Sequence, residues 1–198
     1  MKAEDASEMM DSEKSADKFK TRTAIMIAVL AALLAVTGLG GQNSAKEATN
    51  NNIFASNLYA FYQAKNIRQT SFALAADALE IELANPAASP ETKAAIQKKI
   101  DGYRKNVARY ESEPETQEGK KELLVRAKAM EVIRDHALKQ DPYFDYAEVF
   151  LQIAIVLASV AIVSGIGWLV FGSALLGVLG TLLMINGFLL LVAIPGIG

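Results

Sequence analysis

The residues of this chain that could carry chemistry are few and scattered. It contains no Cys and a single His, His136, so thiol nucleophiles, disulfides and Cys-based metal sites are excluded. Carboxylates are plentiful but alternate with Lys, and His136 lies about 100° around a helix from the face shared by Glu131 and Asp135. We therefore expect no enzymatic activity, no metal site and no cofactor, and interpret His136 as a solvated helical residue.

Two cations lie in an apolar helical pattern within AFYQAKNIRQTSFALA, residues 60–75. Counting by sevens gives two apolar rows, Phe54, Phe61 and Ala75 in one and Leu58, Phe72 and Leu79 in the other. Arg68 falls in the first row and Lys65 in the second. The pattern thus predicts a coiled-coil-like seam that contains both cations.

Residues 42–145 are predicted to form a long extramembrane antiparallel helical hairpin. Residues 43–84 contain no Pro or Gly, and NPAASPET ends that helix at 85–92, with Ser89 as N-cap and Pro90 in the first position of the next helix. The returning arm carries one apolar row, Ile96, Ile100, Tyr103, Val107, Tyr110, Leu123, Ala127, Met130 and Ile133.

The returning arm is also predicted to be interrupted twice. At 111–119 the apolar pattern stops, and Ser112 and Glu115 have the spacing of a capping box. Further on, Asp141 and Pro142 are predicted to start a new helix that continues into the membrane.

The register of the hairpin gives the two cations a role. Closure near residue 87 places Lys65 opposite Tyr110, with Glu111 and Glu113 within one helical turn. Ion pairs of Lys65 and Arg68 with these carboxylates would penalise slipped alignments even if they add little stability. An anion site is the alternative, but no Gly-rich loop or further cluster of Arg supports it.

Three apolar segments predict an all-α membrane protein with three transmembrane helices. A flexible N-terminal tail is expected at 1–22, followed by a first span at 23–41. The uncharged stretch 149–194 suits two further spans, at 146–163 and 169–192, joined by a turn in VSGIGW. About 20 residues of helix cross the roughly 30 Å of hydrocarbon.

The last two spans contain small and polar residues at informative positions. Ala154, Ala158, Ala161 and Gly165 form a stripe on which another helix can approach closely. Gln152, Thr181 and Asn186 are the polar residues at depth. The turn predicts that Gln152 contacts Thr181 and that Asn186 lies level with Tyr146.

Basic residues predict the orientation. Lys14, Lys18, Lys20 and Arg22 precede the first span, and only Lys46 follows it closely. By the positive-inside rule the N-terminus is cytoplasmic, and the hairpin and C-terminus lie on the other side, the periplasm of a two-membrane bacterium.

The segments FYQAKNIRQT and KELLVRAKAMEVIRDHALKQDPYFDYAEVFLQIAIVLASVAI, with the two closing spans, carry a family likeness. Over residues 24–192 the chain resembles an uncharacterised bacterial inner-membrane protein family, a domain of unknown function. The resemblance implies one N-terminal anchor, a long helical insert and a C-terminal helical pair. It implies no activity, cofactor or catalytic residue.

These observations favour a non-enzymatic, membrane-anchored helical scaffold or accessory subunit. Its expected partners are the lipid bilayer and further copies of itself or a larger membrane complex. The net charge of −2 argues against nucleic acid. A channel or transport subunit is the alternative, because polar residues inside spans are costly and often functional.

Overall fold

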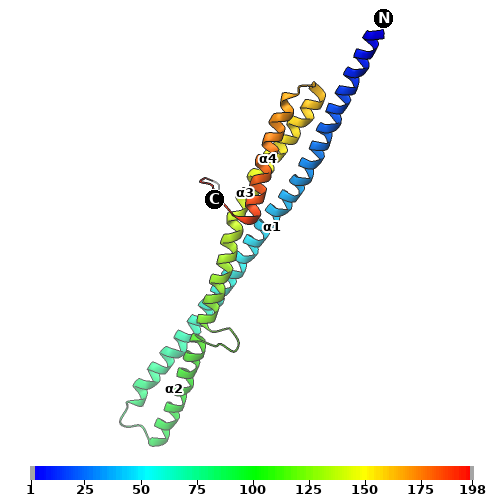
Figure 1. The fold of residues 1–198 in the computed structure, drawn as a ribbon. Coiled ribbons are helices and arrows are strands. Elements are labelled where there is room, and N and C mark those ends of the chain that lie inside the picture. The colour runs from blue at the N-terminus through cyan, green and yellow to red at the C-terminus, as the bar shows by residue number, and fades with distance from the viewer. Residues whose placement is uncertain (1–2, 197–198) are drawn as a thin grey trace. The chain divides into compact units, whose positions relative to one another are not determined.

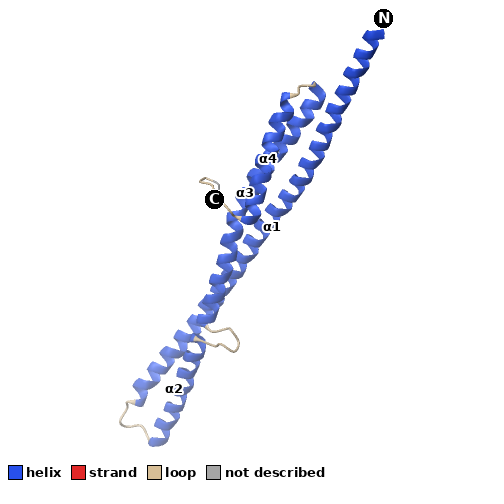
Figure 2. Ribbon diagram, viewed as in Figure 1, coloured by secondary structure: helices blue, strands red, loops and turns tan. Residues whose placement is uncertain are grey.

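A computed structural model describes the backbone of residues 3–196 and the side chains from residue 13 onward. Throughout this range the chain is helical apart from its connecting loops and the segment that follows Leu189 (Figures 1 and 2). The described helices are α1 (Ala3–Leu83), α2 (Pro90–Glu111), α3 (Lys120–Ser164) and α4 (Trp168–Leu189). The fold is therefore all-α, as predicted.

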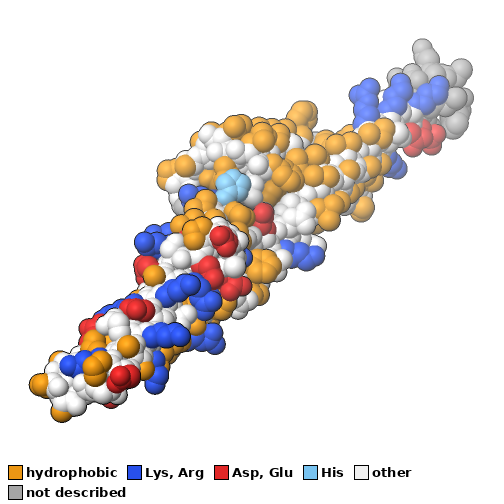
Figure 3. All heavy atoms as spheres, turned by 90° about the horizontal axis from the view of Figure 1, so that it is seen from below, with side chains coloured by type: hydrophobic (Ala, Val, Ile, Leu, Met, Phe, Trp, Pro, Cys, Tyr) orange, Lys and Arg blue, Asp and Glu red, His pale blue; other side chains and the backbone are white. Residues whose placement is uncertain are grey.

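The helices form two compact units. Met1–Ala48 and Asp135–Gly198 form the first, here called the membrane unit, and Thr49–Arg134 form the second, the hairpin unit. Three helices, α1, α3 and α4, contain stretches long and apolar enough to cross a membrane. Hydrophobic side chains gather over the membrane unit, whereas Lys, Arg, Asp and Glu gather over the hairpin unit and near the start of α1 (Figure 3).

The start of α1 differs from the prediction. The sequence predicted a flexible tail at 1–22, but residues 3–22 form the first turns of α1. This segment contains no Gly or Pro and is rich in Ala, Glu, Lys and Met, which are strong helix formers. It continues into the apolar span without a helix-breaking residue, so one helix covers both.

The predicted turns are confirmed. Between α1 and α2, the Ser89 side chain accepts the backbone N–H of Thr92 at 3.2 Å, and Pro90 occupies the first helical position. Between α3 and α4, Gly165 adopts a φ of +68°, a left-handed conformation that glycine tolerates best.

Pro142 lies inside α3 and does not start a new helix. Its ring removes one backbone hydrogen bond, which usually breaks or kinks a helix. Here the residues that follow are deeply buried, since Tyr143, Phe144 and Ala147 are exposed by 4%, 1% and 0%. Burial of this face offsets the lost hydrogen bond, so α3 continues into its apolar stretch.

Phe144 joins three helices in the membrane unit. A Cβ added to Gly40 of α1 would lie 2.6 Å from Cε1 of Phe144, and one added to Gly187 of α4 would lie 2.9 Å from the same atom. The absence of both side chains leaves the space that the ring fills. A second cluster, Leu30, Leu151 and Ala154, packs nearer the other end of the same helices.

Gly187→Ala should destabilise the protein by about 1–3 kcal/mol, the usual cost of overpacking a core. Gly172→Ala on the same helix is the matched control, because no atom lies within 4 Å of the Cβ that this substitution adds. Thermal unfolding of the full chain in mild detergent measures both variants. Equal melting temperatures for the two would contradict the packing of Phe144 against α4.

Candidate functional site

The hairpin unit is built on one face of α1. Its residues recur at intervals of three and four and are buried or half-buried, and we call them the inner row, Ala55, Leu58, Tyr62, Lys65, Gln69, Phe72, Ala76, Leu79 and Leu83. Phe72 packs against Tyr103 and Tyr110 of α2, with ring centroids 5.5 and 5.9 Å away.

The predicted row that contains Lys65 lies in the inner row. The predicted row that contains Arg68 is wrong by one residue along the helix. Leu58, Lys65, Phe72 and Leu79 face the partner helices, but Ala55, Tyr62, Gln69 and Ala76 take the positions predicted for Phe54, Phe61, Arg68 and Ala75. Ala55 and Ala76 are exposed by only 2% and 0%, because small side chains let helices approach closely. Phe54 and Phe61 remain 55% and 39% exposed.

Lys65 is buried within the hairpin unit, with 6% of its surface exposed. Its ammonium lies 3.4 Å from Glu118 and 3.9 Å from Glu113. It also lies 5.4 Å from the ring centre of Tyr110, as the predicted register requires. Carboxylates and an aromatic face thus replace the water that the cation loses.

Gln69, rather than Arg68, is the second polar residue of the inner row. Its amide donates to the Val107 carbonyl and to Glu111, at 3.1 and 3.0 Å, and its oxygen accepts from Lys120 at 2.7 Å. Arg68 is exposed and makes no ion pair with the residues that the structure describes. The predicted pairing of Arg68 with the carboxylates Glu111 and Glu113 is therefore not formed.

The loop between α2 and α3 supplies both carboxylate partners of Lys65, Glu113 and Glu118. Hydrogen bonds to Glu122 of α3 fix the start of this loop. The Glu122 carboxylate accepts the Ser112 hydroxyl at 2.6 Å and the Glu113 N–H at 3.1 Å. The predicted capping box with Glu115 is wrong, since α3 begins only at Lys120. Sequence spacing could not reveal this bond, which bridges two helices across a loop.

This polar cluster can fix register but leaves little capacity for a ligand. Lys65 and Lys120 both face carboxylates, and the Glu111 carboxylate lies 3.4 Å from Lys120. An anion would have to displace these contacts. Among the described residues, no group of three or more His, Asp or Glu side chains is arranged to hold a metal ion.

The polar residues of the C-terminal spans are satisfied differently from the prediction. Thr181 donates to the Gly177 carbonyl of its own helix at 2.7 Å, while Gln152 is exposed on α3, so the predicted contact between them is not formed. A threonine hydroxyl reaches the carbonyl four residues earlier without a partner helix.

Asn186 holds the segment that follows α4. Its amide donates to the Val192 carbonyl at 2.8 Å and accepts the Val192 N–H at 2.9 Å. The Tyr143 hydroxyl donates to the same carbonyl and accepts the Ile194 N–H. Asn186 and Tyr143 thus hydrogen-bond the backbone of Val192 and Ile194, which lie beyond the end of α4 and have no intrahelical partners.

The small-residue stripe is split between packing and turning. Ala154, Ala158 and Ala161 are fully buried, and Ser173 of α4 donates to the Ala154 carbonyl at 2.6 Å. Gly165 is exposed, and no atom lies within 4 Å of the Cβ it lacks. Gly165 therefore ends α3 and does not contribute to helix packing.

The sequence reading missed a second heptad pattern on α1. Every residue of this pattern is exposed, and we call the set the outer row, Ile53, Asn57, Ala60, Ala64, Ile67, Ser71, Leu74, Ala78 and Ile81. The large side chains Ile67, Leu74 and Ile81 are 66%, 64% and 78% exposed. The same intervals of three and four that define the inner row would have identified it.

Lys65→Glu should destabilise the hairpin unit by about 2 kcal/mol, because it places a third carboxylate beside Glu113 and Glu118. Adding Glu113→Lys and Glu118→Lys should restore part of the loss. Arg68→Glu, the exposed control, should change stability by less than about 0.5 kcal/mol. Equal thermal destabilisation by Lys65→Glu and Arg68→Glu would contradict the assignment of the inner row.

Acid should loosen the loop between α2 and α3. The Ser112 hydroxyl and Glu113 N–H lower the pKa of Glu122, and Gln69 and Lys120 lower that of Glu111. Carboxylates with lowered pKa values stabilise the fold above their unfolded pKa, about 4.3 for Glu, and this contribution disappears as pH falls through the folded pKa.

Glu122→Gln should therefore lower the melting temperature at pH 7, with the difference from wild type shrinking below about pH 4. Glu115→Gln changes an exposed carboxylate of the same loop and serves as the control. A Glu122→Gln effect that stays constant down to pH 3 would contradict this role.

Comparison with known proteins gives a family but no activity. No match to the chain was found among curated proteins or among solved structures. A family model matches residues 19–190, which include the hairpin unit and all three apolar stretches. The chain therefore belongs to the family described as Domain of unknown function (DUF4337).

Proposed function

We propose that this protein is a non-enzymatic, membrane-anchored helical scaffold that assembles with further copies of itself through the outer row of α1. The observation that supports this proposal is the outer row itself, a heptad pattern without a partner in the described chain. It extends over Ile53–Ile81, about 42 Å at 1.5 Å per residue.

The outer row has the properties of a helix-binding surface. It lies in the hairpin unit, beyond the uncharged stretch 24–41 of α1, so in this proposal water rather than lipid surrounds its side chains. Isoleucines and a leucine at heptad spacing fit a partner helix and leave apolar surface in water without one. Between them, Ala60, Ala64 and Ala78 allow a second backbone to approach closely.

A second copy of the chain suits this surface because the anchor constrains its direction. Two copies in one membrane with one topology present α1 in the same direction, and a two-fold axis then brings each outer-row residue opposite itself. In heptad terms Asn57 occupies an a position, where a single Asn selects parallel in-register pairing.

This arrangement also gives Arg68 a partner. Gln63 and Arg68 flank the outer row at g and e positions, which face each other across a parallel pair. The Gln63 amide oxygen of one copy can then accept from the Arg68 guanidinium of the other. Arg68 would thus contribute to assembly, whereas Lys65 stabilises the hairpin of its own chain.

The packing of the membrane unit supports the orientation in the proposal, with the N-terminus in the cytoplasm of a bacterial cell. Lys18 and Arg22 line the same cavity as Gly167 of the uncharged turn between α3 and α4. Both belong on one face of the membrane, the cytoplasmic face by the positive-inside rule, and in this proposal the first span carries the chain to the periplasm. A channel is not proposed, because Thr181 and Asn186 hydrogen-bond within the membrane unit.

The stoichiometry of the full chain in mild detergent tests the proposal. We expect wild type to have the mass of a dimer or larger assembly, and Ile67→Asp combined with Leu74→Asp to be monomeric with unchanged helix content. Light scattering coupled to size-exclusion chromatography measures the protein mass.

Val132→Asp is the matched control, since Val132 is 69% exposed on α3 of the same unit and lies outside the outer row. It should leave the assembly intact. A monomeric wild type, or dissociation by Val132→Asp but not by the outer-row variant, would contradict the proposal.

A further inference from the structure

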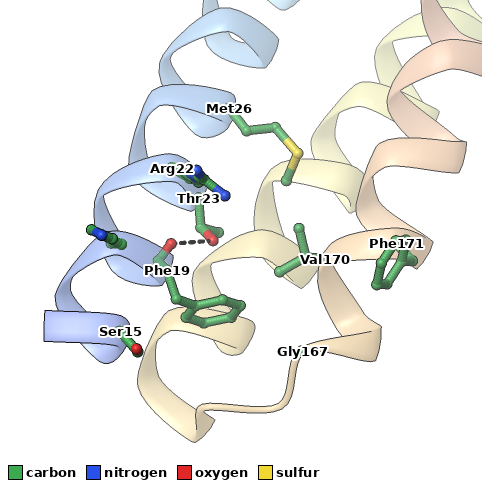
Figure 4. Close-up of a pocket in the computed structure, with 9 residues that line it drawn as sticks. Ser15, Phe19, Arg22, Thr23, Met26, Gly167, Val170 and Phe171 are labelled. Carbon is green, nitrogen blue, oxygen red and sulfur yellow. Dashed lines mark hydrogen bonds between the residues drawn. The ribbon is translucent and has the colours of Figure 1, made fainter. Parts of the chain in front are cut away.

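The membrane unit contains a cavity of about 630 Å³ between the start of α1 and the turn that joins α3 to α4 (Figure 4). Its lining comes from both segments, Ser15, Lys18, Phe19, Arg22, Thr23, Met26, Gly167, Val170 and Phe171. Figure 4 shows Phe19, Arg22 and Met26 on α1 across from Val170 and Phe171 on α4. This volume lies within the usual range of small-ligand sites.

The lining of this cavity has a charged part and an apolar part. Lys18 and Arg22 are one helical turn apart, so they lie on the same face of α1. Met26 follows them on α1, and Val170 and Phe171 line the α4 side. No acidic side chain lines the cavity, and neither cation forms an ion pair within the part of the chain whose side chains are described.

The hydrogen-bond donors that line the cavity indicate the chemical class of the ligand. The Thr23 hydroxyl already donates to the Phe19 carbonyl at 2.9 Å, as the dashed line in Figure 4 marks. The guanidinium of Arg22, the ammonium of Lys18 and the Ser15 hydroxyl are the other donors of the lining. A guanidinium beside an ammonium is suited to a phosphate group, which accepts several charge-assisted hydrogen bonds.

The position of the cavity indicates which kind of molecule contains that phosphate group. Arg22 is the last charged residue before the apolar stretch of α1. The cations therefore lie at the depth of lipid headgroups, and Met26, Val170 and Phe171 lie where acyl chains begin. Basic pockets between transmembrane helices at this level bind anionic headgroups.

We propose that this cavity binds the phosphate of an anionic phospholipid, with Lys18 and Arg22 at the headgroup and the apolar lining against its acyl chains. Binding is independent of assembly through the outer row, so Ile67→Asp with Leu74→Asp should retain it. A soluble phosphate compound has the same negative charge but no acyl chains to contact the apolar part of the cavity lining.

Native mass spectrometry of the purified full chain, titrated with phosphatidylglycerol or phosphatidylcholine, tests this proposal. Wild type should bind phosphatidylglycerol at least about tenfold more tightly than phosphatidylcholine. Lys18→Gln with Arg22→Gln should weaken phosphatidylglycerol binding by about ten- to thirtyfold, from the loss of two cations near the headgroup. Circular dichroism verifies that the helix content is retained.

Lys14→Gln with Lys20→Gln is the matched control, because it removes the same charge from exposed residues of the same segment that do not line the cavity. It should change binding by less than about twofold. An equal loss in the control, or no preference for phosphatidylglycerol in wild type, would overturn the site. Displacement of the lipid by millimolar inorganic phosphate would instead identify a soluble anion as the ligand and overturn the lipid assignment.

Discussion

Close approach of helices at alanine and glycine is the constraint on which both units depend. In the hairpin unit, Ala55, Ala76 and Ala127 are among the most buried residues, and in the membrane unit Ala154, Ala158 and Ala161 are fully buried. Small side chains bring backbones together and increase dispersion contacts between helices. They also leave the large apolar side chains on the outer surfaces.

This distribution has different consequences in the two units. In the membrane unit, outward-facing residues such as Val163 and Phe171, 90% and 80% exposed, can be solvated by lipid. In the hairpin unit, the sequence around Ile67 and Leu74 is charged, so in the proposed topology water rather than lipid surrounds their exposed side chains. The same packing that leaves apolar side chains on the outside of the membrane unit therefore leaves an apolar row on α1, the row through which we propose self-assembly.

The long apolar helices, the turns and the hairpin were predictable because each depends on local chemistry. Runs without charge, Ser89 before Pro90, and glycine at 165 act within one helical turn of where they lie. The inner row was half predictable: hydrophobicity favours Phe54 over Ala55, but close packing of the helices favours the smaller side chain at this position. The pairing of Lys65 with Glu118 and the bond from Glu122 to Ser112 depend on loop geometry that residue spacing does not encode.

The charged residues of α1 differ in role according to their surroundings. Lys65 is enclosed by partners of its own chain, and removing them would leave a buried charge, so it acts on folding. Arg68 is exposed beside the outer row, where the proposed assembly would place another copy. Lys18 and Arg22 lie just before the apolar stretch of α1 and line a cavity that has no acidic side chain in its lining.

Disulfide cross-linking along α1 in native membranes tests self-assembly most directly. The chain contains no Cys, so a series of single Cys substitutions, one at each position of 67–74, tests each position separately. Parallel, in-register pairing predicts cross-linked dimers at 67, 71 and 74, where facing Cα atoms come within about 7 Å. It predicts none at the inner-row positions 69 and 72. Uniform cross-linking along the segment, or none at 67, 71 and 74, would contradict the account.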